Sequence, residues 1–354
     1  QLTPSKNLLT MTSCCQAPKL EPDVTVRQLE ERVLELSGLK LNEELFVFDV
    51  EIEINGKNYQ IHTYRCGDGN ADDLVLLHGY AGSSALYYPM LADLSKRFRV
   101  HCFDWIGMGL SSKEKFECET AQETIDFLVS SVEKWRIAVG LDTFYLAGHS
   151  FGGYVSAQYT YYHQDRVKKL SLLSPIGITK HEKEQTIDDI KKKFGFFKRL
   201  MISCIQGFVM KAWENKTTPP RLIKDYPRFG RYLVNNYVYK RFGLKKDQAP
   251  IVKDYLLAML QLPEGAEVAI HYILKPPLAQ AHVPLEDIIT NEIKIDVDCY
   301  FGEIDYMDMT GAKRIESQRI KRNFYLKSVP KAAHQLTMQN PKPLVEEIIR
   351  SIAV

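Results

Sequence analysis

The stretch Leu146-Ala147-Gly148-His149-Ser150-Phe151-Gly152-Gly153 decides how this chain folds. The apolar run that ends at Ala147 predicts a strand, and the run over 154–162 predicts a helix. The residues between them fit the pattern G-x-S-x-G, a tight turn that raises a serine above a parallel sheet. Side chains at 148 and 152 would collide with the neighbouring strand and helix, so glycine is needed there. Ser150 is therefore a candidate nucleophile at a helix N-terminus, where backbone N–H groups can hold an oxyanion.

The composition excludes several classes of protein. The chain has 354 residues, 45% of them hydrophobic and 25% charged, and a net charge of +2, so its overall charge does not indicate nucleic-acid binding. No apolar run reaches the roughly 18 residues of a membrane-spanning helix. The seven cysteines are scattered and lack C-x-x-C spacing, which favours a reducing compartment over a disulfide framework or a zinc site. We expect no metal and no cofactor.

Residues 1–40 predict a tail followed by a short helix. Residues 1–22 contain three prolines and no periodicity, and residues 1–20 contain two lysines and no acid, which also fits the remnant of an organelle-targeting segment. The capping-box spacing of 25–28 and apolar side chains at 26, 29, 33 and 36 predict a helix that ends near Gly38. Glutamates line its polar side, so packing on the core is favoured over lying on a membrane.

The next segment, 41–175, predicts the first part of an α/β core. Alternating apolar residues on both sides of Asn55-Gly56 predict a hairpin. Repeated strand and helix patterns follow, and they resume in 291–354. Such alternation predicts a mostly parallel sheet flanked by helices. The strands are expected at 74–77, 99–104, 143–147, 169–173, 293–301 and 324–329, and the helices at 85–97, 121–139, from 310 and from 341.

Residues 176–290 interrupt this alternation. The segment is helix-like, without a clear strand, and basic, with 19 Lys and Arg against 12 Asp and Glu. An insertion at the carboxyl ends of parallel strands is expected to form a helical cap or lid over a binding pocket. One run in it interleaves basic and apolar residues, which suits either a helix packed on the core or a lid on an anionic membrane. Its members are Lys191, Lys192, Lys193, Phe194, Phe196, Phe197, Lys198, Arg199, Leu200 and Met201.

A serine nucleophile needs a base and an orienting acid. In this topology the acid follows the next-to-last strand and the histidine follows the last one. His334 is the only histidine after the final strand. Asp305 is favoured as the acid in the preceding loop, Asp308 is the alternative acid, and Glu303 is third.

Two backbone N–H groups should form the oxyanion hole. One is that of Phe151, directly after the serine, and the other is assigned to Tyr80 in the loop after the strand 74–77. His78, at the start of that loop, is expected to be structural rather than catalytic.

On these residues the chain resembles the α/β-hydrolase fold family. Within it, the chain is similar to a lipid-acting branch of N-acyl phospholipid lipases, cardiolipin deacylases and the coactivator of triglyceride lipase. The resemblance implies a catalytic triad of Ser150, Asp305 and His334. It rests on His78–Gly82, Phe103–Ser112, Gly148–Tyr154, Tyr300–Asp308, His334 with Asn340-Pro341, and Gly265–Leu285 in the cap.

Two departures from that branch bear on the reaction. The branch often carries H-x-x-x-x-D at its histidine, a pattern linked to acyl transfer, whereas this chain has Gln339 at the aspartate position and reads Ala-Ala-His rather than Ala-Gly-His before it. The coactivator members lack the serine that this chain keeps at 150.

These observations predict a serine esterase or lipase that cleaves an acyl ester of a phospholipid or lysophospholipid. The alternatives are a catalytically idle scaffold or lipase coactivator and, less favoured, an acyltransferase. The expected partners are a lipid substrate, an anionic membrane surface, and proteins that bind the cap or the N-terminal segment, but no nucleic acid. The expected location is intracellular and peripheral to a membrane, in the mitochondrion or else in the cytosol or at lipid droplets.

Overall fold

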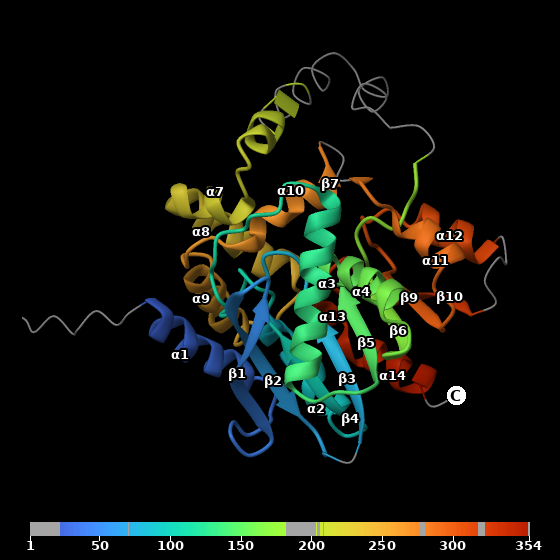
Figure 1. The fold of residues 1–354 in the computed structure, drawn as a ribbon. Coiled ribbons are helices and arrows are strands. Elements are labelled where there is room, and N and C mark those ends of the chain that lie inside the picture. The colour runs from blue at the N-terminus through green and yellow to red at the C-terminus, as the bar shows by residue number, and fades with distance from the viewer. Residues whose placement is uncertain are drawn as a thin grey trace, which may run out of the picture.

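An eight-stranded sheet forms the centre of the molecule, as the computed structural model shows (Figure 1). The structure describes residues 22–69, 71–181, 203, 206–207, 209–276, 280–317 and 323–352. The strand order is β1-β2-β4-β3-β5-β6-β9-β10, and the strands from β4 to β10 in this order are parallel, as predicted. The strands are β1 (Leu45–Ile54), β2 (Lys57–Cys66), β3 (Asp72–Leu77), β4 (Phe98–Phe103), β5 (Phe144–His149), β6 (Val167–Leu173), β9 (Val297–Gly302) and β10 (Phe324–Val329).

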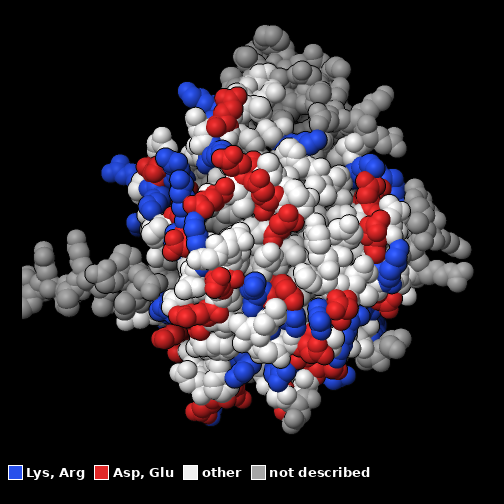
Figure 2. Space-filling view, in the orientation of Figure 1, with Lys and Arg blue, Asp and Glu red and all other residues white. Residues whose placement is uncertain are grey.

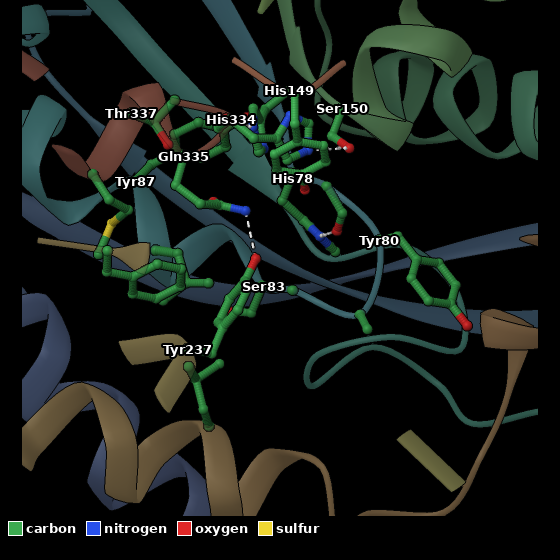
Figure 3. A pocket seen from close by; sticks show the side chains of 18 residues that line it. His78, Tyr80, Ser83, Tyr87, His149, Ser150, Tyr237, His334, Gln335 and Thr337 are labelled. Carbon is green, nitrogen blue, oxygen red and sulfur yellow. Dashed lines mark hydrogen bonds between the residues drawn. The ribbon is translucent and has the colours of Figure 1, made fainter. Parts of the chain in front are cut away.

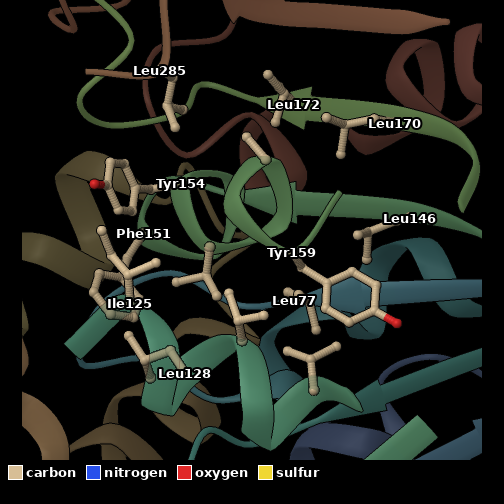
Figure 4. Close-up of a cluster of buried hydrophobic side chains, with 14 of the residues drawn as sticks. Leu77, Ile125, Leu128, Leu146, Phe151, Tyr154, Tyr159, Leu170, Leu172 and Leu285 are labelled. Atoms are coloured by element: carbon tan, nitrogen blue, oxygen red, sulfur yellow. The ribbon is translucent and has the colours of Figure 1, made fainter. Parts of the chain in front are cut away.

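Helices cover both faces of this sheet. Along β3, Val75 and Leu77 point into one hydrophobic cluster, and Leu74 and Leu76 point into another, because successive side chains of a strand face opposite ways. Figure 4 shows part of the first cluster. Its helices are α3 (Ala121–Ala138), α4 (Phe151–Tyr162), α11 (Leu285–Asn291) and α12 (Thr310–Ser317). The second cluster includes residues of α1 (Pro22–Glu35), α2 (Tyr88–Leu94), α9 (Ala249–Met259) and α14 (Pro341–Ile352).

The predicted hairpin is confirmed. Ile54 pairs with Lys57, so Asn55 and Gly56 form a two-residue turn, with φ values of +53° and +76°. Asparagine and glycine tolerate this left-handed backbone, and such turns match the natural twist of the two strands. The hairpin places β2 beside β4, in antiparallel pairing.

Two predicted helix starts are corrected. Helix α1 begins at Pro22, so the capping box predicted at Thr25 is wrong, since proline is itself favoured in the first turn. Gly38 has φ +80° and follows the helix end, as predicted. The helix expected over 85–97 is divided into the 3₁₀ turn η1 (Ser84–Tyr87) and α2, which has Pro89 in its first turn.

The chain leaves the sheet after β6 and returns at β9. The intervening segment contains α7 (Pro219–Asp225), α8 (Pro227–Asn236), the π-helical turn η2 (Tyr237–Arg241), α9, η3 (Ala266–Ala269), α10 (Ile270–Ile273) and α11. It also contains a two-residue antiparallel ladder, β7 (Leu274–Lys275) with β8 (Gln280–Ala281), where no strand was predicted. The basic and apolar run over 191–201 lies outside the described residues, and the predicted segment boundaries stay predictions. In the described part of the chain, no helix is long and apolar enough to cross a bilayer.

A buried ionic cluster fastens α1 to the sheet. Nε2 of His62, on β2, lies 2.8 Å from Glu30 Oε2, and its Nδ1 lies 2.6 Å from Asp49 Oδ1. Burial alone would lower the pKa of His62, but the Glu30 charge and the hydrogen bonds to Asp49 and Glu30 raise it to about 10. His62 is therefore a buried cation at neutral pH. The hydroxyls of Tyr64 and of Tyr255 on α9 donate to Glu30 Oε1, at 2.5 and 3.1 Å.

We expect Glu30→Gln to lower the free energy of unfolding by about 3–5 kcal/mol, because it leaves a buried cation short of a partner. Urea denaturation at neutral pH measures this, with the exposed neighbour Glu31→Gln as the control. The raised pKa of His62 stabilises the fold fully below about pH 6.5, and this contribution is lost as the pH rises through about 10. The difference between the two variants should therefore shrink at alkaline pH, and equal stability at neutral pH would contradict the assignment.

Candidate active site

Ser150 lies on a strained turn between β5 and α4. Its backbone has φ +54° and ψ −113°, a conformation that costs a non-glycine residue roughly 1–3 kcal/mol. A Cβ at Gly148 would lie 2.3 Å from Ser156 Oγ of α4, and one at Gly152 would lie 2.2 Å from the carbonyl oxygen of Leu77 on β3. The predicted collisions with strand and helix are thus confirmed, and the two glycines allow the close packing that holds the turn.

His334 lies beside this serine, on the loop between β10 and α13 (Leu336–Gln339). Its Nε2 is 3.0 Å from Ser150 Oγ, and both residues are buried. His149, the variable residue of the G-x-S-x-G turn, donates from Nε2 to the carbonyl oxygen of His334 at 2.8 Å. Burial lowers the pKa of His149, so it remains a neutral donor. The turn therefore positions the histidine loop as well as the serine.

Asp305 reaches His334 through a third residue. Its Oδ1 is 3.7 Å from His334 Nδ1, too far for a hydrogen bond. Ser174 Oγ lies between them, 2.7 Å from His334 Nδ1 and 2.6 Å from Asp305 Oδ2. Since the Ser174 hydroxyl donates to the carboxylate, it accepts from Nδ1–H. This arrangement leaves the lone pair of Nε2 free to accept the hydrogen bond from Ser150.

Sequence reasoning missed Ser174. The residue directly follows β6 and precedes Pro175, and its backbone is also left-handed, with φ +47°. A Ser-Pro pair after a strand is a common turn, so the sequence alone gives no reason to join this serine to residues 305 and 334.

The other two acids of the same loop make different contacts. Asp308 Oδ1 accepts from the backbone N–H of Thr310 at the start of α12, and its Oδ2 lies 3.4 Å from His181 Nε2. Glu303 accepts from the backbone N–H of Lys331 at 2.8 Å. Of the three candidates, the structure therefore brings only Asp305 into hydrogen-bonding contact with the Ser174–His334 pair. Its role as the acid stays a prediction.

The loop expected to supply one oxyanion donor passes close to the serine. A Cβ at Gly79 would lie 3.0 Å from His149 Nδ1 and 3.3 Å from the Cβ of Ser150, so a side chain there would fit only if these neighbours shifted. The backbone N–H of Gly82 donates to the carbonyl oxygen of Gly79, and Ala81 has φ +51° in the turn so formed. Tyr80 is in this turn, and Phe151 is the first residue of α4. Their assignment as the two oxyanion donors stays a prediction.

His78 at the start of the same loop is structural. Its Nδ1 is 2.8 Å from the carbonyl oxygen of Gly79, and its Nε2 accepts from the backbone N–H of Trp105 at 3.2 Å. Complete burial lowers the pKa of His78 to about 3, so it remains neutral and holds two loops together.

The serine opens into a pocket of about 260 Å³ (Figure 3). One part of its wall is polar and contains Ser150, His334 and Gln335. Another part is apolar and contains Leu86, Phe242, Leu256 and Met338. Polar groups that converge beside an apolar wall suit a substrate with one reactive polar bond and one hydrocarbon part.

His334 is held in its basic form. Burial, followed by the proximity of His149 and of the Arg241 charge, lowers the pKa of His334 to about 3. The imidazole is therefore unprotonated at neutral pH and can accept a proton from Ser150, whose hydroxyl alone is a weak nucleophile.

Comparison with known proteins agrees with this architecture. Residues 73–219 match the family model described as alpha/beta hydrolase fold. The chain has the α/β-hydrolase fold. A crystal structure of the carboxylesterase CesB from Bacillus subtilis superimposes with a TM-score of 0.64 at 20% identity, covering 93% of this chain and 98% of that one. The predicted fold class is thus confirmed.

Two curated plant relatives carry acyltransferase names. A probable 1-acylglycerol-3-phosphate O-acyltransferase of Oryza sativa is 29% identical over 285 residues, which cover 77% of this chain and 65% of the relative. A 1-acylglycerol-3-phosphate O-acyltransferase of Arabidopsis thaliana is 30% identical over 285 residues, which cover 77% of this chain and 64% of that relative. The chain thus spans slightly less than two thirds of the length of these relatives. Both are named for reactions of glycerolipids, as expected for members of a lipid-acting branch.

We expect Ser174→Ala to slow acylation of Ser150 by about ten- to a hundred-fold, because a hydrogen bond to a charged group is worth roughly 1.5–3 kcal/mol. The rate of labelling by a fluorophosphonate measures this. Ser131→Ala, which removes a buried hydroxyl on α3 outside the site, is the control. An unchanged labelling rate would show that Asp305 can support His334 without the bridging hydroxyl.

The lowered pKa of His334 predicts an unusual acid limb. Labelling of Ser150 should remain nearly constant as the pH falls through 6.5, where an exposed histidine would become protonated. Because the unfolded chain binds this proton more readily than the folded chain, stability should decrease as the pH falls from about 6.5 towards 3. Labelling rates from pH 8 to pH 4 test the prediction, and a midpoint near 6.5 would contradict it.

Proposed function

We propose that the protein is a serine hydrolase that cleaves an acyl ester of a phospholipid or lysophospholipid. The observation that carries this proposal is the 3.0 Å contact between Ser150 Oγ and His334 Nε2, on a tight turn that directs the serine into the pocket. The apolar wall of the pocket supports an acyl substrate. The names of the plant relatives support a glycerolipid rather than a peptide or sugar.

The chemistry follows from the arrangement of the side chains. Ser150 attacks the ester carbonyl while His334 takes its proton, and Ser174 with Asp305 stabilises the imidazolium that forms. The backbone N–H groups of Tyr80 and Phe151 would hold the oxyanion of the tetrahedral intermediate. His334 then returns the proton to the leaving alcohol, and water releases the acyl group from Ser150.

Acyl transfer is the second candidate, because the two plant relatives are named 1-acylglycerol-3-phosphate O-acyltransferases. In that reaction the hydroxyl of a lysophospholipid takes the place of water at the acyl-enzyme. The absence of the H-x-x-x-x-D aspartate weighs against it. In the structure Gln339 accepts from the backbone N–H of Ala333 and donates to the carbonyl oxygen of Arg241, both at short distance. Its side chain thus ties the histidine loop to the cap segment.

Ser150→Ala should abolish fluorophosphonate labelling and lower fatty-acid release from phospholipid and lysophospholipid at least about a thousand-fold. Mass spectrometry of the lipids after incubation with wild type and variant measures both substrate and product. A folded wild-type protein that neither labels nor releases fatty acid would leave the idle scaffold as the better description.

The same incubation separates hydrolysis from transfer when 1-acylglycerol-3-phosphate and an acyl donor are added. A hydrolase releases the same amount of free fatty acid with and without 1-acylglycerol-3-phosphate, whereas a transferase forms the diacyl product. Gln339→Asp restores the branch pattern and is the matched variant. Diacyl product from the wild type would establish transfer, and its appearance only in Gln339→Asp would assign the difference to that position.

A further inference from the structure

The segment after α7 has an exposed face with aromatic and basic side chains. Between residues 226 and 246 it contains no acidic residue. Six of the thirteen large hydrophobic side chains that are exposed in the described part of the chain lie between residues 226 and 239. Tyr226, Phe229 and Tyr232 are 62%, 53% and 63% exposed. Scattered exposed apolar residues need no explanation, but a contiguous group of them indicates a binding surface. We call this group, with Leu233, Tyr237 and Tyr239, the aromatic face.

The opposite side of this segment packs against the rest of the protein. The same segment already buries Gly230, Val234, Val238 and Phe242, at intervals of four residues, against the rest of the protein. Gly230 packs so closely on α7 that a Cβ there would lie 2.4 Å from the carbonyl oxygen of Ile223. One side of α8 and η2 thus packs inward, and the aromatic face is what the other side presents to solvent.

The charge of this segment has one sign. From Tyr226 to Lys246 there are six Lys and Arg residues and no Asp or Glu. Within the described residues none of the six forms an ion pair, although the guanidinium of Arg241 lies 5.5 Å from the ring centre of Tyr306. Figure 2 shows Lys and Arg side chains in the region of α7 and α8, with Asp and Glu side chains beside them. The basic residues are Arg228, Arg231, Lys240, Arg241, Lys245 and Lys246.

The aromatic face continues to the mouth of the pocket. Tyr237 belongs to both, and its hydroxyl accepts from Nε2 of Gln335, the residue after His334. The exposed ring of Tyr306 also lines the pocket, and its centre lies 5.0 Å from the centre of the His334 ring. A molecule seated on this face would therefore lie next to the pocket that Ser150 lines.

We propose that the aromatic face docks on a bilayer that contains anionic phospholipid. Tyrosine and phenylalanine rings suit the boundary between head groups and acyl chains, and unpaired cations beside them attract anionic head groups. Because the aromatic side chains lie on the outer side of a helix, a flat lipid surface fits them better as a partner than a peptide, which would need a groove. The choice of a lipid as the partner rests on the proposed function. The existence of the exposed aromatic face does not depend on that function.

Flotation with phosphatidylcholine vesicles, with and without added phosphatidylglycerol, tests the proposal. Wild type should bind the anionic vesicles, and Arg228→Gln/Arg231→Gln/Lys240→Gln should bind them about tenfold or more weakly, with a similar loss in Phe229→Ser/Tyr232→Ser. Replacing three exposed lysines elsewhere, Lys40, Lys96 and Lys134, with glutamine should change binding little. All variants should turn over a soluble short-chain ester at the wild-type rate.

Ser150→Ala keeps this test separate from catalysis, because it should bind vesicles as well as wild type does. Equal binding of wild type to neutral and anionic vesicles, or equal binding of the control and the aromatic-face variants, would overturn the docking proposal while leaving the hydrolase proposal intact. Self-association of wild type that Phe229→Ser/Tyr232→Ser abolishes would identify the face as a protein interface instead.

Discussion

The candidate site depends on two serines held in left-handed backbone at the ends of neighbouring strands. His149 at the end of β5 pairs with Leu173 at the end of β6, so Ser150 and Ser174 leave the sheet side by side. The N–H of Ser150 donates to the carbonyl oxygen of Leu173 at 3.0 Å, and the N–H of Ser174 donates to that of Tyr300 on β9 at 2.7 Å. Each strained turn is thus tied to the next strand. Because the strands of the parallel sheet end side by side, they hold both serines at a positive φ that an isolated turn would not keep.

This edge also explains why a hydroxyl separates the acid from the histidine. Asp305 follows β9 and is buried, with its carboxylate accepting from Ser174 and from the backbone N–H of Met307. A serine hydroxyl donates one hydrogen bond, and that bond goes to the carboxylate, so the hydroxyl oxygen must accept from His334. The direction of the chain of hydrogen bonds is therefore fixed, and it points the lone pair of Nε2 at Ser150. The Ser174 hydroxyl therefore keeps the proton of His334 on Nδ1, which a direct contact with the carboxylate would also do.

Much of this could be predicted from local sequence. The hairpin at Asn55-Gly56, the glycines at 148 and 152, and the alternation of strands and helices each have a local physical cause that the sequence displays. The position of His334 followed from topology, because parallel strands deliver the loops after them to one edge. The preference for Asp305 over Asp308 rested on loop position alone, and only the structure shows Asp308 at the start of α12. Ser174 and Glu30 could not be predicted, since no local motif marks them. Ser174 contacts Asp305 and His334, and Glu30 contacts His62 and Tyr255, all more than thirty residues away in the sequence.

The contacts of Glu30 connect the site to the cap in a way that constrains how the pocket can open. Tyr255 on α9 shares its hydroxyl between Glu30 and Ser83, whose Oγ is 2.6 Å away. Ser83 ends the loop of Tyr80 and lines the pocket, and its neighbour Ser84 donates from its backbone N–H to buried Asp104. A movement of α9 away from the sheet would break this buried chain of polar groups or pull the loop of Tyr80 with it, and an unpaired buried polar group is costly. Substrate entry that keeps α9 in place, past the aromatic face and Tyr306, avoids both costs.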